Sequence, residues 1–515
     1  MTTKDRPPKR SLLYVASISL LFVCVVWSAQ LRTAKTNDHQ TVPKADASTD
    51  SPAEIQINLD KAMQLALPNP RASLRATSFK TRDGKNGWVI RIPGQHAIAT
   101  PAYADGVLFV GGGYGSHEFY AFNAQTGALI WRARTKDDGP SAAVVEDGYV
   151  AFNTESCTIE VCHAKTGKIA WQEWLGDPLM SQPAISKGRL YIAYPSGQRG
   201  HQQALSQGQP ESSQGTGGHS SHRLLCADLK TGRHLWEREI TADVISAPVI
   251  SGDQVLFTCF DGTSFCLNAS TGAVIWTKDN AGTSAPLVAN GEVVVTQKEQ
   301  RDGKDYEGLQ RMDLQRGAGK EKKLLAAGEA KYLGEGKGGG VGISAQAQGA
   351  ADAAVGFSAP PPAAKLEKAN KHLGVRTVVG GWAYQGSRPT YKSGQMMNAQ
   401  GRFINSVRSK DGRFVWRAEV KGASIEPDSQ VFSPPALGEK NMYLCSSMGH
   451  VVSVGQKNGQ VGFAYSTRKS MAFQPALARG NIYVGTVDGL LICLKTGEPD
   501  ADGWYAWGGN AQHNK

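Results

Sequence analysis

Short apolar runs separated by turns recur along most of the chain. Matching stretches at 100–112, 182–194, 247–259 and 474–486 each begin with a small or polar residue and Pro, and contain two apolar runs joined by a Gly turn. Runs rich in Val, Ile, Leu, Phe and Tyr are typical of short strands buried on both faces. The Asp-Gly, Lys-Gly and Asn-Gly pairs at 105–106, 187–188 and 290–291 predict tight hairpin turns between such strands.

A second motif follows these paired runs: a Gly, three residues, then a Trp. Its five copies end at Trp131, Trp171, Trp236, Trp276 and Trp416. The Gly suits a turn with positive φ, and a Trp at one fixed place per unit is expected to cover the seam between neighbouring sheets. Because the units repeat at a period near 40 residues, each is predicted to be one four-stranded blade of a β-propeller.

Counting the units predicts an all-β, eight-bladed propeller over residues 85–500. Six clear units cover about 97–131, 138–171, 178–236, 243–276, 429–465 and 470–497, and the chain between Trp276 and Trp416 is long enough for two more. The strand that closes the ring is expected at 87–93, with 500–509 as the competing candidate. Residues 501–515 are otherwise expected to form a C-terminal tail.

The repeat resembles the pyrroloquinoline-quinone (PQQ) repeat, whose signature is roughly Ala-x-Asp-x-x-Thr-Gly-x-x-x-Trp. Ala121, Thr126, Gly127 and Trp131 match this signature, with Asn123 in the place of Asp. The resemblance implies the eight-bladed fold that quinoprotein alcohol dehydrogenases share with the non-catalytic, BamB-like outer-membrane assembly scaffolds. The dehydrogenases commonly carry two adjacent cysteines beside the quinone, whereas no two of the 8 cysteines here are adjacent. The chain therefore resembles the scaffolds more than the dehydrogenases.

The N-terminal residues predict a membrane anchor. Four cations within residues 1–10 precede an uncharged apolar run at 11–29, which is long enough to span a bilayer. Upstream cations favour a cytoplasmic start, so the propeller is expected on the periplasmic side of the inner membrane as a single-pass protein. A cleaved signal peptide at 11–29 is the alternative. The polar segment 30–71 is predicted to be a flexible tether.

Composition adds two further expectations. The stretches 196–222 and 334–371 are of low complexity and lack apolar periodicity, so they are predicted to be disordered inserts in the ring. The net charge is +11, but the cations are dispersed and accompany no basic helix or aromatic stacking module. We therefore expect a monomeric propeller with envelope or membrane proteins as partners, and not nucleic acid.

Function is expected on one face of the ring. In a four-stranded meander the second-to-third and fourth-to-first connections share a face, and the longer loops of this chain fall there. The candidate ligand or partner residues on it are His117, Glu118, Glu155, Asp177 and Met180, unless these are simply solvated loop residues. No catalytic residue or metal ligand is identified, and no residue supports PQQ binding. The sequence favours an interaction or assembly scaffold without catalysis; a small-molecule or sugar-binding propeller and a PQQ-dependent oxidoreductase are the alternatives.

Overall fold

The computed structural model describes residues 53–113, 115–154, 158–176, 181–195, 222–301, 304–327, 387–425 and 431–515. The predicted cytoplasmic segment 1–10, the predicted anchor 11–29 and the insert 334–371 lie outside these residues, as does all of the insert 196–222 except His222. The described part of the chain is all-β apart from one short 3-10 helix, η1 (Leu59–Lys61). Within it, no helix has the length and apolar character needed to cross a membrane.

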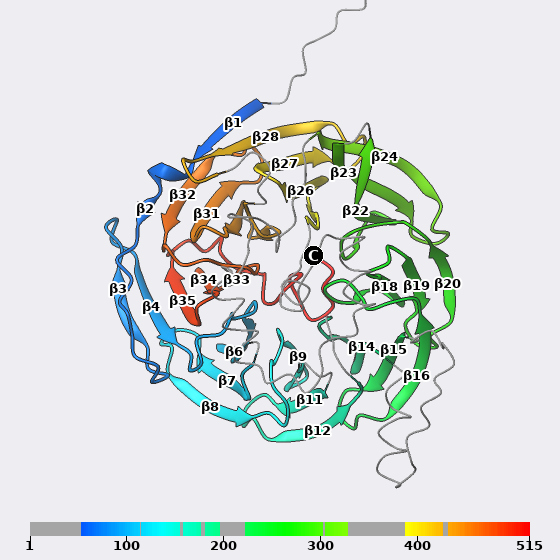
Figure 1. Ribbon diagram of the computed structural model, residues 1–515, viewed down its shortest axis with the longest axis horizontal. Helices are drawn as coiled ribbons and strands as arrows, with labels where there is room; N and C mark the ends of the chain where they lie inside the picture. The colour runs from blue at the N-terminus through cyan, green and yellow to red at the C-terminus, as the bar shows by residue number, and fades with distance from the viewer. Residues whose placement is uncertain are drawn as a thin grey trace, which may run out of the picture. The chain divides into compact units, whose positions relative to one another are not determined.

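The strands form eight sheets arranged in a ring, which confirms the predicted eight blades (Figure 1). Blade 1 contains β5 (Ala102–Ala104), β6 (Val107–Gly111), β7 (Glu118–Asn123) and β8 (Leu129–Arg134), and blade 2 contains β9 (Val144–Glu146), β10 (Tyr149–Asn153), β11 (Thr158–His163) and β12 (Ile169–Trp174). Blade 3 contains β13 (Ala184–Ser186), β14 (Arg189–Pro195), β15 (His222–Asp228) and β16 (His234–Ile240), and blade 4 contains β17 (Val249–Ser251), β18 (Gln254–Thr258), β19 (Ser264–Asn268) and β20 (Val274–Lys278). Each sheet is an antiparallel meander whose first strand is innermost.

Blades 5 to 8 continue the ring. Blade 5 contains β21 (Leu287–Ala289), β22 (Glu292–Arg301), β23 (Lys304–Asp313) and β24 (Gly319–Ala327), and blade 6 contains β25 (Thr390–Lys392), β26 (Gln395–Gln400), β27 (Phe403–Arg408) and β28 (Phe414–Lys421). Blade 7 contains β29 (Ala436–Leu437), β30 (Asn441–Cys445), β31 (His450–Gly455) and β32 (Val461–Ser466), and blade 8 contains β33 (Ala476–Ala478), β34 (Asn481–Gly485), β35 (Leu490–Lys495) and β4 (Asn86–Arg91). Both faces of every blade meet a neighbour, which explains why the strands are apolar runs and not alternating patterns.

Strand β4 closes the ring. It pairs antiparallel with β35, with Trp88 opposite Cys493, so that the N-terminal and C-terminal parts of the propeller share blade 8. This is the first of the two predicted closing strands. The competing segment, 500–509, contributes no strand to blade 8, and its bridge between Leu477 and Trp504 is isolated.

Part of the segment predicted as a tether is instead bound to the outside of the ring. Strand β1 (Ala53–Asn58) pairs in parallel with β28, and β2 (Met63–Gln64) pairs in parallel with β32. Strand β3 (Thr77–Lys80) then pairs with β4. Blades 6, 7 and 8 therefore each have a fifth, outermost strand (Figure 1). The prediction of a tether does not hold for residues 53–58 and 63–64, because their backbone groups complete the outer edges of blades 6 and 7.

The repeat tryptophans lie at the seams between blades. Each indole Nε1 donates a hydrogen bond to a main-chain carbonyl of the next blade: Trp131 to Ala164 (2.9 Å), Trp171 to Leu229 (2.7 Å), Trp236 to Ala269 (3.0 Å), Trp276 to Leu314 (2.9 Å) and Trp416 to Gln456 (2.9 Å). Trp131, Trp276 and Trp416 are buried, and Trp171 and Trp236 are half-buried. In five of the eight blades, one side chain thus joins the blade to the next.

The residues predicted as a C-terminal tail, 501–515, lie inside the ring (Figure 1). Trp504, Trp507 and His513 are each at most 1% exposed. The segment accepts main-chain hydrogen bonds from the innermost strands of four blades: Tyr103 to Tyr505 (2.6 Å), Ile185 to Ala511 (2.8 Å), Ile250 to Gln512 (2.9 Å) and Leu477 to Trp504 (2.7 Å). The tail prediction is therefore wrong: the segment satisfies N–H groups of inner sheet edges that would otherwise face the channel.

Candidate partner-binding surfaces

The loop face is the side of the ring that carries the β6–β7, β10–β11, β8–β9 and β12–β13 connections. Three of the five predicted site residues on it, Glu155, Asp177 and Met180, lie outside the described residues. The structure places the other two, His117 and Glu118, where β7 begins. The grouping of all five on one binding surface stays a prediction.

His117 and Glu118 have different surroundings. His117 is exposed, and its carbonyl accepts a hydrogen bond from the Thr135 N–H at 2.9 Å. Glu118 is half-buried: it accepts a hydrogen bond from the Tyr120 hydroxyl at 2.5 Å and lies 3.5 Å from the Arg132 guanidinium. Burial, followed by the hydrogen bond to Glu118, raises the pKa of Tyr120. Of these two residues, His117 is thus the more exposed, whereas Glu118 is engaged by Tyr120 and Arg132.

Two acidic residues near His117 were not predicted as site residues. Burial and the neighbouring charge of Asp137 raise the pKa of Asp138, while His117 acts in the opposite direction. Glu160, in β11, is 1% exposed; burial raises its pKa to about 7, and its carboxylate accepts a hydrogen bond from the Lys136 N–H at 3.2 Å. The sequence signal that could have identified Glu160 is its position as a charged residue within a run of apolar strand residues. Among the described residues, no three His, Cys, Asp or Glu side chains form a group suited to a metal ion.

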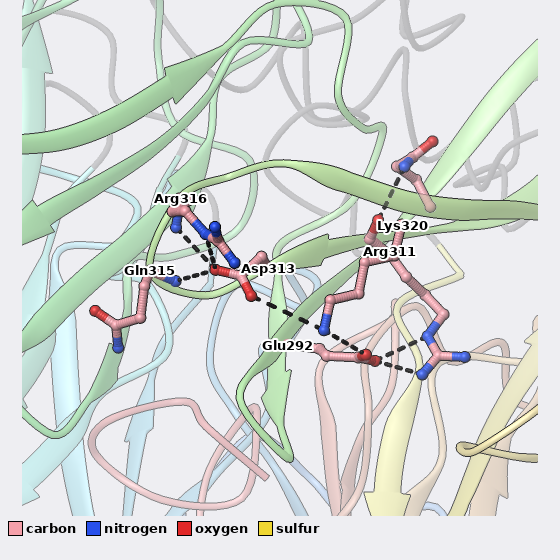
Figure 2. A network of polar contacts seen from close by, with 7 residues as sticks. Glu292, Arg311, Asp313, Gln315, Arg316 and Lys320 are labelled. Carbon is pink, nitrogen blue, oxygen red and sulfur yellow. Dashed lines mark hydrogen bonds and ion pairs between the residues drawn. The ribbon is translucent and has the colours of Figure 1, made fainter. Parts of the chain in front are cut away.

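A charged network lies on the opposite side of blade 5, where the turns are tight (Figure 2). Glu292 accepts hydrogen bonds from Arg311 Nε and Nη2 at 2.8 and 2.5 Å and pairs with Lys320 at 3.1 Å. Asp313 lies 3.9 Å from Lys320 and 3.7 Å from Arg316. Burial alone would raise the pKa of Glu292, but Arg311 and Lys320 hold it below its ordinary value. Both carboxylates of this network are paired with cations of the same blade, so neither is left as a free anionic site.

At the centre of the ring, Arg388 holds the C-terminal segment. This side chain precedes the first strand of blade 6 and is 1% exposed. Its Nε donates to the Pro286 carbonyl at 3.2 Å and its Nη2 to the His513 carbonyl at 2.6 Å. The guanidinium also lies 5.2 Å from the ring centre of Trp507, a cation–π distance. Arg388 thereby links blades 5 and 6 to the segment inside the ring.

His513 makes the reciprocal contact. Its Nδ1 lies 2.7 Å from the Trp507 carbonyl oxygen and its Nε2 lies 2.9 Å from the Pro183 carbonyl oxygen. The pKa of His513 is lowered to about 4 by burial and, to a lesser extent, by Arg388, while the hydrogen bonds to the two carbonyls act in the opposite direction. The neutral imidazole can donate only one of these hydrogen bonds. Arg388 and His513 thus both face main-chain carbonyls of the protein.

Comparisons with known proteins agree with this architecture. Residues 72–323 and 376–499 match the family model described as outer membrane protein assembly factor BamB. A curated relative with that name from Nitrosomonas eutropha is 21% identical over 222 residues, 39% of this chain and 48% of the relative. Another, from Yersinia pestis, is 24% identical over 211 residues, 34% of this chain and 53% of the relative. The chain spans about half the length of these curated relatives.

A solved structure adds support for the fold alone. Sqt1 of Saccharomyces cerevisiae aligns over 78% of this chain and 96% of its own with a TM-score of 0.51, at 8% identity. The eight meander sheets and the repeated contacts between Trp and the next blade define a β-propeller of the PQQ-repeat type. Because the family model covers more than half of the residues, the chain belongs to the BamB family within that class.

Proposed function

We propose that this chain is an assembly scaffold of the cell envelope, which binds proteins of outer-membrane assembly and catalyses no reaction. Membership of the BamB family supports the envelope role. The observation that carries the scaffold reading is the position of residues 501–515. They occupy the centre of the ring, and Arg388 and His513 direct their hydrogen bonds to protein carbonyls there. Such a centre does not fit a quinone or a sugar, so binding is expected on outer surfaces.

The first test uses photo-crosslinking residues placed at His117 or His163 in the full chain. Both side chains are exposed, but His117 lies on the loop face and His163 ends β11 beside the tight turns. We expect crosslinks to outer-membrane assembly proteins from position 117 and not from position 163. Dye-linked alcohol oxidation after reconstitution with PQQ and calcium would contradict the proposal. His117→Ala should leave thermal stability within about 0.5 kcal/mol, since an exposed loop side chain contributes little to folding.

The proposal includes a location: residues 11–29 anchor the chain in the inner membrane, and the propeller lies on the periplasmic side. The cations before the apolar run support this orientation. Reporter fusions after residue 75 test it. A fusion whose reporter works only in the cytoplasm would refute the orientation, and release of a shortened, soluble chain would indicate a cleaved signal instead.

A further inference from the structure

The outer edges of the blades are not equivalent. Blades 6, 7 and 8 are covered by β1, β2 and β3, whereas in the described residues blades 1 to 5 end at their fourth strand. Going round the ring, β8 of blade 1 is the first uncovered edge after β3 (Figure 1). An uncovered edge strand presents unpaired backbone N–H and C=O groups, which another extended chain can bind.

The sequence of β8 closely matches that of β28, the strand that β1 covers. Residues 129–134 read LIWRAR and residues 414–419 read FVWRAE. In the β1–β28 pair, Glu54 lies opposite Arg417 and Ile55 lies opposite Ala418. The residues of β8 that correspond to Arg417 and Ala418 are Arg132 and Ala133. Blade 1 thus has the side chains that receive a parallel strand in blade 6.

Among the described residues, no strand covers β8 as β1 covers β28. At the seam between blades 6 and 7, Gly459 is buried against Ile55 and Trp416 is 1% exposed. At the seam between blades 1 and 2, the corresponding Gly167 is half-exposed, and its nearest neighbours are atoms of the Trp131 ring. Leu129 and Ile130 are 40% and 47% exposed. The seam that Ile55 fills between blades 6 and 7 is therefore more open at its counterpart between blades 1 and 2.

Charge indicates what kind of segment would bind. The Arg132 side chain is 57% exposed, and its ion pair with Glu118 is a long one, at 3.5 Å. Where β28 has Glu419, β8 has Arg134, so the edge of β8 carries two cations. A strand lying like β1 would place its residues corresponding to Glu54 and Gln56 opposite these cations. Opposite charges placed across neighbouring strands are favourable.

We propose that β8 binds an extended segment of a partner protein as a fifth, parallel strand. The segment has acidic residues opposite Arg132 and Arg134 and an aliphatic residue between them, which lies beside Trp131 and Gly167. The inference rests on the proposed scaffold function and adds to it the position and chemical class of one bound segment. Main-chain hydrogen bonds supply affinity at such an edge, and the alternating side chains supply specificity.

The test uses the full chain in detergent and a fluorescein-labelled peptide, AEIEIN, in which the β1 sequence carries a second acidic residue. Fluorescence anisotropy should show saturable binding. Arg132→Glu should weaken binding at least tenfold, and the peptide AKIKIN should bind that variant better than it binds the wild type. Lys278→Glu is the matched control, because it makes the same charge change on the uncovered edge strand β20 of blade 4 and should leave binding unchanged. Melting temperatures show whether each variant is folded.

Three results would overturn the inference. Peptide binding could be absent, or it could be equal in the wild type and in Arg132→Glu. Sedimentation could instead show dimers that Arg132→Glu dissociates, which would make a second copy of this chain the occupant. If the peptide fails to bind while crosslinks from position 117 persist, the β8 inference fails and the scaffold function stands.

Discussion

Gly459 lies directly beneath the indole ring of Trp416, and an ideal Cβ on Gly459 would be 2.7 Å from that ring. The same relation holds at four other seams, where a Cβ on Gly167, Gly232, Gly272 or Gly317 would be 2.6 or 2.7 Å from the Trp of the preceding blade. Each of these glycines also has a φ between 64 and 72°. The repeat therefore needs Gly for two reasons, a left-handed turn and the space for a ring.

A comparison of Gly459→Ala with Gly148→Ala separates these two reasons. Gly459 has φ +67°, and its Cβ would also meet Ile55, whereas Gly148 has φ +77° and nothing within 4 Å of its Cβ. We expect Gly148→Ala to lower the free energy of unfolding by roughly 1 kcal/mol through backbone strain. Gly459→Ala should lower it by roughly 2–4 kcal/mol, because overpacking adds to the strain. Urea denaturation of both variants provides the measurement; equal losses would mean that the Trp ring moves aside freely.

The blade count could be predicted from the sequence because the signal is local and repeated. Turn chemistry, apolar runs and the Gly-to-Trp spacing all occur within one blade, and the fifth blade was placed although it carries Arg316 where four of the five copies have Thr. The closing strand β4 was also identified, since its Gly84 and Trp88 keep the same spacing. Local features of this kind do not depend on which distant segments meet.

The parts that were missed or predicted wrongly depend on distant contacts. Residues 53–58 form a strand because the edge of β28, more than 350 residues later, is available to them. Arg388 immediately precedes a Pro of the repeat, a position that other residue types occupy in other blades. Its role is visible only in the folded protein, where it contacts His513 and Trp507. Burial of Glu160 likewise follows from packing between blades. Sequence periodicity contains no information about such pairings.

His513 should make the protein less stable in mild acid. Its pKa is lowered from 6.5 to about 4 in the folded state. At a pH between these two values, the unfolded chain therefore binds the proton more readily than the folded protein does. The stability that the neutral form contributes is complete above pH 6.5 and is lost as the pH falls towards 4. The wild type should lose about 2 kcal/mol from this group between pH 7.5 and 5.

His513→Gln should abolish that part of the pH dependence. The exposed His163→Gln is its control and should behave like the wild type. Burial also lowers the pKa of His96 and His450, so some acid sensitivity should persist in both variants. Denaturant midpoints measured from pH 7.5 to 5 test the expectation; identical slopes for wild type and His513→Gln would refute it.

Glu160 should have the opposite effect. Its pKa is raised from 4.5 to about 7, so the folded protein binds the proton more tightly in this window. The contribution to stability is present below pH 4.5 and is lost as the pH rises through 7. Glu160→Gln removes the buried charge and should stabilise the protein at pH 8 by about 1–3 kcal/mol. The exposed Glu439→Gln should have no such effect, and a destabilised Glu160→Gln variant would show that the carboxylate is needed in its charged form.

Deletion of residues 501–515 should expose particular strands and not the whole ring. The N–H groups of Tyr103, Ile185, Ile250 and Leu477 lose their acceptors, and these residues belong to β5, β13, β17 and β33. Hydrogen exchange should accelerate in those four inner strands, because a freed edge N–H opens to solvent without global unfolding. Strand β9 is the internal control, since its contact with the segment is a side-chain one, from Gln512 to Glu146 at 3.5 Å. Uniform acceleration across all blades would instead mean that the segment is required for the ring to close, and unchanged exchange would mean that it does not hold the inner edges at all.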